Sequence, residues 1–347
     1  MTARVLPDDA SGRSAAVVTL RAGGLVAMPT DTVYGLGVVL DAPNGLPRLF
    51  AAKDRPLDRA IVLLVADAAQ AASVGVMPPA ARVLAERFWP GGLTLVLAQV
   101  PDARLPAVLT GGATTIGIRL PDHSCPRALA RELGPLPVTS ANVSGRPDAR
   151  DAAGVLEQLG DRVDLVLDGG PARGGVPSTV VDCSSDLPRV LRAGAVGPGP
   201  IVDALEDTLF EGSNSPDEFS GKALAVRVVG IDAAVEAASR HNQKLWATGA
   251  IDDADSWAAA LGLELGSADP DLGWEFVCRL VDAVPDEVLG VVGAGALEEF
   301  CSVAAGSFVD RIEARARENL RFRTALGSVW QHGIPDDPYH RIRTAAG

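Results

Sequence analysis

Three cations lie close together between residues 53 and 59 of this chain: Lys53, Arg55 and Arg59. Arginine binds phosphate or carboxylate through a planar, two-pronged guanidinium, and lysine offers a point charge. Such a cluster predicts a site for a phosphorylated or carboxylated small molecule. The alternative is a solvated loop with ordinary surface charges, and this segment alone leaves both interpretations open.

Two polar turns supply the hydroxyl and amide groups that such a site needs. Thr30-Asp31-Thr32 follows an apolar run that Pro29 ends, and residues 139–145 (TSANVSG) follow a second apolar entry. Ligands in α/β sheets bind beyond strand ends, where such turns lie. The chain has no G-x-x-x-x-G-K-[ST] loop and no G-x-G-x-x-G after its first apolar strand, which excludes P-loop chemistry and the usual dinucleotide cradle.

Short apolar segments alternate with short helical patterns from residue 14 to about residue 210, which predicts one α/β domain. Residues 1–13 are polar, and we expect them to be frayed. The predicted helices are 14–21, 45–52, 79–88, 126–133 and 151–159. The predicted strands are 25–28, 61–65, 93–97, 114–121, 165–167, 177–182 and 189–195.

The remainder of the chain has a different pattern. Residues 211–220 (EGSNSPDEFS) are polar, with Gly and Pro, and predict a linker. Beyond the linker, residues 221–347 predict a smaller, mainly helical domain with apolar residues four apart on one face: Phe308, Ile312, Ala316 and Leu320. An arginine-rich stretch there predicts a solvated face paired with Glu313 and Glu318, formed by Arg311, Arg315, Arg317, Arg321 and Arg323.

Composition narrows the possible functions. The 347 residues are 47% hydrophobic and 22% charged, as in ordinary globular proteins. A net charge of −13 disfavours broad nucleic-acid binding. The four cysteines form no C-x-x-C pair, so we expect no structural zinc. We see no signal peptide and no apolar run of spanning length, which predicts a cytoplasmic protein without a membrane partner.

Seven motifs in residues 14–210 resemble, in order, those of the YrdC-type threonylcarbamoyl-adenylate synthases. They are Thr30 to Leu36 (TDTVYGL), Lys53-x-Arg55-Pro56, Phe88-Trp89-Pro90-Gly91, Ile118-Arg119-x-Pro121, Ser140-Ala141-Asn142-x-Ser144-Gly145, Ser178 to Asp182 (STVVD) and Leu191-Arg192-x-Gly194-Ala195. The second part resembles a bacterial helical domain of unknown function at residues 291–298 and 308–313. It does not look like the Rossmann-like extra domain of some longer family members.

The resemblance implies an open, twisted α/β sheet with flanking helices around a basic concave pocket. The implied enzyme is a nucleotidyltransferase that combines L-threonine, bicarbonate and ATP into threonylcarbamoyl-adenylate and pyrophosphate. Mg²⁺ would accompany ATP. The product would pass to the tRNA threonylcarbamoyl transferase complex, which modifies adenosine 37 of tRNAs that read ANN codons.

The resemblance also implies roles for individual residues. Lys53 and Arg55 would be catalytic, and we expect their side chains to face the pocket. The residues implied for the nucleotide are Arg55, Arg59, Thr115, Asn142 and Arg192. Those implied for threonine or the carbamate are Thr32, Arg119, Ser140 and Ser178. No metal ligand is implied, and we expect Asp31 and Asp182 to orient neighbouring cations.

The chain departs from the family pattern at three places. Ala60-Ile61 follows the basic loop where the family usually has Pro-Leu, and Leu64 stands where a polar residue, often His or Ser, is common. Residues 148–150 (DAR) replace a Ser-Pro-Thr. The departure at Leu64 bears on a threonine contact, and the one at 148–150 bears on a nucleotide contact. Two alternative functions stay open. One is the carbamoyl-adenylate chemistry of hydrogenase maturation factors, although their zinc-finger cysteines and acylphosphatase region are not visible here. The other is an RNA-binding or translation-associated module of the same fold.

Overall fold

The computed structural model describes residues 3–210, 221–251 and 254–347. The chain divides into two compact units, Met1–Gly197 and Pro198–Gly347. Helix α8 (Pro198–Phe210) belongs to the second unit, whereas the sequence prediction placed it in the first domain. The predicted linker at 211–220 lies outside the described residues.

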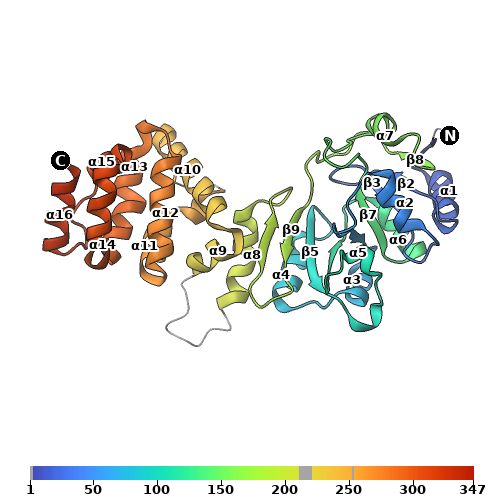
Figure 1. Ribbon diagram of the computed structural model, residues 1–347, viewed down its shortest axis with the longest axis horizontal. Coiled ribbons are helices and arrows are strands. Elements are labelled where there is room, and N and C mark those ends of the chain that lie inside the picture. Colours follow the sequence, from blue (N-terminus) through green and yellow to red (C-terminus); the bar gives the residue numbers. More distant parts are fainter. Residues whose placement is uncertain (1–2, 211–220, 252–253) are drawn as a thin grey trace. The chain divides into compact units, whose positions relative to one another are not determined.

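The first unit is built on one mixed sheet of ten strands (Figure 1). Their order across the sheet is β1-β8-β2-β3-β7-β4-β6-β5-β9-β10, so neighbours in space are mostly distant in sequence. The strands are β1 Arg4–Pro7, β2 Val26–Met28, β3 Gly35–Gly37, β4 Val62–Leu64, β5 Leu93–Ala98, β6 Thr115–Arg119, β7 Leu136–Ser140, β8 Leu165–Asp168, β9 Thr179–Asp182 and β10 Arg189–Arg192. The predicted α/β sheet with flanking helices is therefore confirmed.

Seven α-helices flank this sheet in the described part of the first unit, and several begin where the sequence provides a cap. Asp9 and Asp151 accept a backbone hydrogen bond at the starts of α1 and α7, each at 2.8 Å, and Pro79 opens α4. The helices are α1 Ala10–Arg21, α2 Gly45–Ala52, α3 Ala68–Val74, α4 Pro79–Phe88, α5 Ala107–Thr110, α6 Ser124–Leu133 and α7 Ala152–Leu159. Helices α1 and α6 pack together over a core of Leu, Val, Ala and Met from β2, β4, β7 and β8.

The N-terminal segment is ordered, contrary to the sequence prediction. Residues Arg4–Pro7 form β1, which pairs in parallel with β8, and α1 begins four residues before the predicted helix start at 14. Three of the four β1 side chains are exposed and none is fully buried, so the strand lacks the alternation of buried and exposed residues that would reveal it in the sequence. Its partner lies about 160 residues later, and sequence-local reasoning has no access to that pairing.

The described part of the second unit is mainly helical, as predicted. Its α-helices are α8 Pro198–Phe210, α9 Gly221–Val229, α10 Ile231–Thr248, α11 Leu261–Ala268, α12 Pro270–Ala283, α13 Leu289–Val292, α14 Glu298–Glu318, α15 Leu320–Leu326 and α16 Asp336–Ala346. Phe308, Ile312 and Ala316 are buried on α14, as their spacing predicts. Leu320 begins α15 and is 69% exposed, so the expected apolar face ends one turn earlier.

One stretch, Asp286–Glu318, passes a length and composition test for a membrane span, contrary to the expectation of no such run. Of its most apolar window, 56% is buried inside the structure. Phe300 and Ile312 in this stretch are fully buried among neighbouring helices. We therefore interpret it as a core helix of the second unit.

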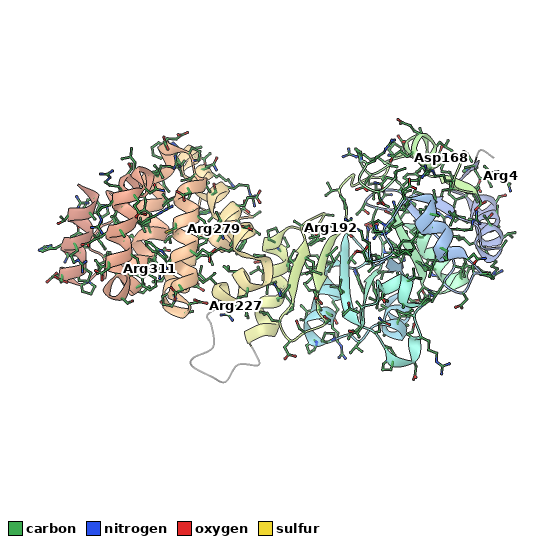
Figure 2. The ribbon with its side chains drawn as sticks, viewed as in Figure 1. Arg4, Asp168, Arg192, Arg227, Arg279 and Arg311 are labelled. Carbon is green, nitrogen blue, oxygen red and sulfur yellow. The ribbon has the colours of Figure 1, made fainter. Side chains whose placement is uncertain are left out.

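Three arginines of the stretch on α14 and α15, namely Arg311, Arg315 and Arg321, pair with acids outside these two helices rather than with Glu313 and Glu318. Arg311 and Arg315 each lie 2.6 Å from a carboxylate of α12, Asp271 and Asp282 respectively. Glu313 instead pairs with Arg341 of α16 at 2.8 Å. Figure 2 labels Arg279 and Arg311 among these helices.

Candidate functional site

A cavity of about 400 Å³ lies on one face of the first unit's sheet. Its size is typical of small-molecule sites. Alternate residues of three adjoining strands form much of its wall, because side chains two apart on a strand share a face. They are Val62 and Leu64 of β4, Thr115, Gly117 and Arg119 of β6, and Thr94 and Val96 of β5.

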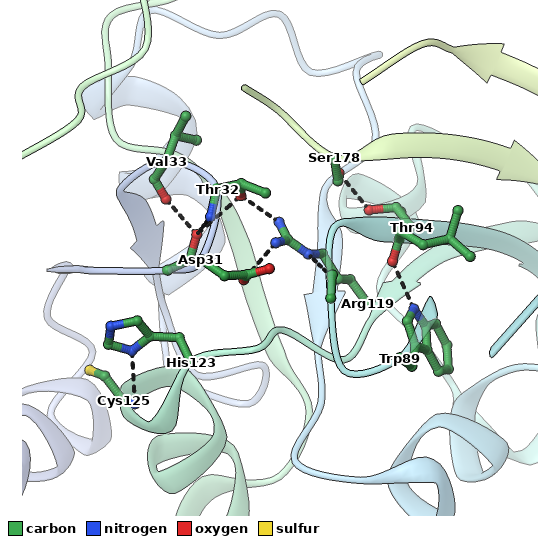
Figure 3. Close-up of polar contacts among 12 residues, drawn as sticks. Asp31, Thr32, Val33, Trp89, Thr94, Arg119, His123, Cys125 and Ser178 are labelled. Atoms are coloured by element: carbon green, nitrogen blue, oxygen red, sulfur yellow. Dashed lines mark hydrogen bonds and ion pairs between the residues drawn. The ribbon is translucent and has the colours of Figure 1, made fainter. Parts of the chain in front are cut away.

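Arg119 organises one end of the cavity, and Figure 3 shows its contacts. Its Nη1 donates to the Thr32 hydroxyl at 2.8 Å, its Nη2 to Asp31 Oδ1 at 2.7 Å and its Nε to the Gly91 carbonyl at 2.9 Å. The residue is only 6% exposed. Burial lowers the pKa of Arg119, and the charge of Asp31 opposes that shift.

Arg119 keeps donors for a ligand despite these three bonds. A guanidinium carries five N–H groups, so Nη1 and Nη2 each retain one. The prediction that Arg119 holds a carboxylate is compatible with this geometry. Asp31 orients this cation, as expected; Asp182 instead accepts from the backbone and hydroxyl of Ser184 at 2.9 and 2.7 Å.

The 30–32 turn is internally bonded, which presents the Thr32 hydroxyl to Arg119. Thr30 Oγ1 donates to the Val33 carbonyl at 2.6 Å and accepts the Thr32 amide at 3.1 Å. Thr30 and Thr32 are 4% and 2% exposed, respectively. Short hydroxyl side chains bonding nearby backbone in this way stabilise a turn after a strand. These bonds fix the position of the Thr32 hydroxyl from within the turn.

Lys53 is buried beneath the loop at residues 140–145 and does not face the cavity, contrary to the prediction. It is 1% exposed, and its ammonium donates to the carbonyls of Ser140 and Asn142 and to Asn142 Oδ1. These three acceptors use all three ammonium hydrogens. Burial, and then the charge of Arg55, lowers the pKa of Lys53 to about 8.

The Asn142 side chain likewise forms hydrogen bonds within the loop at residues 140–146. Its side-chain oxygen accepts from the Ser140 hydroxyl at 2.6 Å, and its amide nitrogen donates to the Arg146 carbonyl at 2.6 Å. Asn142 is 5% exposed and is not among the lining residues of the cavity, whereas Ser140 is. Lys53 and Asn142 thus shape the loop that presents Ser140.

Arg55 and Arg192 bring charge to the cavity without a carboxylate partner among the described residues. Arg55 donates to the carbonyls of Arg59 and Ala60, at 3.3 and 2.7 Å. Arg192 donates to the Ser178 carbonyl at 2.7 Å. Burial is the main cause that lowers the pKa of both arginines, and the charge of Arg59 adds to it at Arg55. The charges of Asp58 at Arg55 and of Asp148 at Arg192 oppose this shift without a direct ion pair. A bound anion would supply the direct partner that the described residues do not give these two cations.

Ser178 contacts both Arg192 and Thr94 of strand β5, and so links Arg192 to the sheet. Its hydroxyl lies 2.8 Å from the Thr94 hydroxyl and 3.2 Å from Arg192 Nη2. Ser178 and Thr94 are 7% and 1% exposed. Sequence reasoning missed Thr94, whose only signal is its place in an apolar strand two residues after a glycine pair.

The structure brings together seven of the ten predicted site residues in the lining of this cavity: Thr32, Arg55, Thr115, Arg119, Ser140, Ser178 and Arg192. The other three, Lys53, Arg59 and Asn142, are not lining residues, and Arg59 is exposed on the loop next to Arg55. The cavity lining also includes residues from all three places where the chain departs from the family pattern: Ala60, Ile61, Leu64 and Asp148. Asp148 is the one carboxylate among the described lining residues.

The donor set does not fit a protein-built metal centre. Among the described residues, no group of three or more His, Cys, Asp and Glu side chains is placed to hold a metal ion. Asp31, the acid nearest Arg119, is already paired with that arginine at 2.7 Å. Any divalent ion in the reaction would therefore need most of its ligands from the nucleotide and water.

Comparison with known proteins gives two family matches. Residues 18–194 match the Sua5/YciO/YrdC family model, described as "Telomere recombination", and residues 236–347 match a family of unknown function (DUF6869). The second match agrees with the resemblance of this part to a domain of unknown function. It assigns no activity to the helical unit.

Named relatives and a solved structure match the first unit. The threonylcarbamoyl-AMP synthase of Bacillus subtilis (strain 168) is 43% identical over 183 residues, which cover 52% of this chain and 53% of that protein. The synthase of Thiobacillus denitrificans is 38% identical over 177 residues, which cover 50% of this chain and 91% of that protein. The crystal structure of Pyrococcus abyssi Sua5 complexed with L-threonine aligns with a TM-score of 0.55 at 35% identity, covering 59% of this chain and 60% of that one.

The match thus spans about half the length of the Bacillus relative and nearly all of the Thiobacillus relative. In both cases the shared region is the unit that holds the ten-stranded sheet and its cavity. This chain belongs to the Sua5/YciO/YrdC family.

Proposed function

We propose that this chain is an L-threonylcarbamoyladenylate synthase, which converts L-threonine, bicarbonate and ATP into threonylcarbamoyl-adenylate and pyrophosphate. The observation that carries the proposal is the convergence of seven side chains, from motifs spread over residues 32–192, on one cavity of about 400 Å³. Relatives named threonylcarbamoyl-AMP synthase support it. The cavity offers cations for a phosphate, a guanidinium for a carboxylate and hydroxyls for the amino acid.

In this proposal the amino acid occupies the Arg119 end of the cavity. The free N–H groups of Arg119 hold its carboxylate, and Thr32, Ser140 and Ser178 bond its polar groups or the carbamate. Leu64 is opposite Arg119 in the β4–β6 register and also lines the cavity. An apolar side chain at this position provides contact for the threonine methyl group.

The nucleotide in this proposal lies against Arg55, Thr115 and Arg192, with the exposed Arg59 reaching the phosphates from the rim. The threonine amine takes up CO₂ derived from bicarbonate to form a carbamate. A carbamate oxygen then attacks the α-phosphorus of ATP, the bond to the β-phosphate oxygen breaks, and pyrophosphate leaves. Preorganised cations and correct placement of the two reactants supply most of the catalysis in such a transfer.

Lys53 enters the proposal as a positioning residue rather than a ligand of the phosphates. Its ammonium bonds the loop that carries Ser140, so it acts on the substrate through that loop. Arg55 remains the cation that we assign to the transition state. Mg²⁺ enters as the MgATP substrate, with the phosphates as its main ligands.

The wider role is also a proposal. The product would serve the N6-threonylcarbamoyl modification of adenosine 37 in tRNAs that read ANN codons, through a separate transferase complex in the cytoplasm. Threonylcarbamoyl-adenylate is a reactive mixed anhydride, so transfer to a nearby acceptor enzyme is chemically reasonable. No role follows for the helical unit.

The test is pyrophosphate release by the purified chain with MgATP. We expect release only when L-threonine and bicarbonate are both present, with threonylcarbamoyl-adenylate detected by mass spectrometry. Degassed buffer without bicarbonate and buffer without threonine are the matched blanks. Release that does not depend on threonine, or no release with all substrates present, would reject the proposal.

A further inference from the structure

Residues 169–177 form a glycine-rich strap between β8 and β9 that lies along the 30–32 turn. The Gly174 amide donates to the Asp31 carbonyl at 3.0 Å, and the Gly175 amide donates to the Thr32 carbonyl at 2.8 Å. The strap ends at Pro177, which lines the cavity together with Ser178. The strap therefore connects the two residues, Thr32 and Ser178, that bond Arg119 and Arg192.

The Tyr34 hydroxyl holds the other end of this strap. It donates to the Gly170 carbonyl at 2.8 Å and accepts the Gly169 amide at 3.1 Å. The residue is fully buried and is one of the residues that line the cavity. Burial raises the pKa of Tyr34 to about 12, so the hydroxyl keeps its proton and continues to donate.

The backbone of Tyr34 adds two further connections. Its amide donates to the Ala149 carbonyl at 2.9 Å, and its carbonyl accepts the Ala141 amide at 2.8 Å. Ala141 follows Ser140 directly in the loop that Lys53 supports. Tyr34 thus joins three segments of the cavity wall that are far apart in sequence.

Gly174 is the residue that lets the strap lie this close to the turn. A Cβ atom at this position would be 2.7 Å from the Asp31 carbonyl oxygen and 3.3 Å from Thr32 Cα. Both are backbone atoms of a turn that its own hydrogen bonds hold in place, so neither can move aside cheaply. Any larger residue would lift the strap away from the turn.

We propose that Tyr34 is a positioning residue for the amino-acid end of the cavity: its hydroxyl holds the strap against the 30–32 turn, which sets the spacing of Thr32 and Ser178. This inference rests on the proposed function, because it assigns that end to threonine. The Tyr34 hydroxyl acts on that end of the cavity through the strap, because it bonds Gly169 and Gly170.

The first experiment compares the full-length chain with Tyr34→Phe. The variant keeps the buried ring and leaves the Gly169 amide and Gly170 carbonyl without this partner. We expect the KM for threonine to rise roughly 5- to 30-fold, the scale of one or two lost buried hydrogen bonds. The KM for ATP should change much less. The control is Tyr339→Phe, at the second of the two tyrosines of the chain, on α16.

The second experiment perturbs the same strap at Gly174, near the end opposite to the one that Tyr34 bonds. Gly174→Ala should also raise the KM for threonine, whereas Gly306→Ala, where a Cβ meets nothing within 4 Å, should not. If both changes act by lifting the strap, the double variant Tyr34→Phe/Gly174→Ala should lose less than the product of the two single effects. Gly174→Ala also tests the inference if Tyr34→Phe fails to fold.

A third measurement does not depend on any enzymatic activity. Amide hydrogen exchange of peptides covering residues 169–177 and 30–34 should be faster in Tyr34→Phe than in the unmodified chain, with other peptides of the sheet unchanged. Unchanged exchange in these two segments, or an unchanged KM for threonine, would overturn the inference. If exchange is faster in Tyr34→Phe but the unmodified chain releases no pyrophosphate, the role of Tyr34 in holding the strap is supported and the proposed function is rejected.

Discussion

Arginines serve different purposes in the two units of this chain. At the cavity of the first unit, Arg55 and Arg192 donate to backbone carbonyls, which orient each guanidinium and, among the described residues, leave it without a carboxylate in direct contact. In the second unit, Arg279, Arg311 and Arg315 each pair with a carboxylate on another helix at 2.6 Å. The partner of an arginine therefore indicates its role: a carbonyl leaves the charge available to an anionic ligand, and a carboxylate uses that charge within the fold.

Arg119 combines both arrangements, because it pairs with a carboxylate within the fold and also keeps N–H groups for a ligand. It pairs with Asp31 and also donates to a carbonyl and a hydroxyl, and it is 6% exposed. Arg119→Ala would leave Asp31 buried without its cation, which costs about 3–5 kcal/mol of unfolding free energy for a buried pair. Urea unfolding measures this loss. The double variant Arg119→Ala/Asp31→Ala should recover part of it, and no recovery would contradict the pairing as the cause.

Arg55→Ala should separate activity from stability. We expect a loss of about 2–4 kcal/mol in transition-state stabilisation, the scale for one preorganised electrostatic partner, measured as kcat/KM for pyrophosphate release. The unfolding midpoint should hardly change, because Arg55 is half-buried and bonds only carbonyls of its own loop. The matched control is Arg82→Ala, an exposed arginine of α4 that also donates to a carbonyl, that of Met77, but does not line the cavity. An equal loss of kcat/KM in Arg55→Ala and Arg82→Ala would contradict a catalytic role for Arg55.

The pH dependence of the unfolding free energy tests the burial of Lys53. This cation is buried and bonds only oxygens that carry no formal charge. Burial lowers its pKa from the ordinary value to about 8, so between that pH and the ordinary lysine pKa the unfolded chain binds more protons than the folded one. Unfolding free energy therefore gains a favourable contribution as pH rises through this window. Relative to Lys53→Met, the unmodified chain should become more stable as pH rises from about 8 to 10.5, measured by urea unfolding. A difference that is constant with pH would contradict the burial of the charged form.

Arg315→Ala should have a small effect. Its pair with Asp282 is partly exposed, with side chains 31% and 45% accessible, and such pairs are worth about 0–1 kcal/mol. Thermal unfolding should shift slightly, and pyrophosphate release should keep its rate. A large loss of activity would show that charge in the helical unit serves the reaction and would break the contrast between the units.

Removal of the whole second unit should change the reaction least. The cavity and all seven lining residues that we predicted lie within Met1–Gly197, and a unit of this size can bury its own core. A chain ending at Gly197 should release pyrophosphate at close to the full-length rate. A folded but inactive truncation that regains activity when residues 198–347 are added separately would show that the helical unit completes the site.

The sequence by itself determined many of the local elements and most of the residues of the site, seven of the ten predicted. Helices 45–52 and 79–88 were predicted at their observed bounds, because Pro and Gly delimit an apolar periodic pattern in each case. The motifs also identified most of the cavity lining. Short polar residues that follow apolar strands lie near strand ends, where α/β sheets bind ligands, so their types and order are informative even without their positions.

The tertiary structure alone decided how individual side chains are used. Lys53 and Arg55 are two residues apart in one motif, yet Lys53 points beneath the loop at 140–145 and Arg55 points into the cavity. Likewise, the partner of Arg311 is Asp271, forty residues earlier, and not the nearby Glu313. Strand β1 and the boundary at residue 197 depend on comparable long-range pairings. The physical reason is common to these cases: burial, hydrogen-bond partners and strand pairing depend on segments that only folding brings together, and these contacts decide whether a charge binds a ligand or holds the chain.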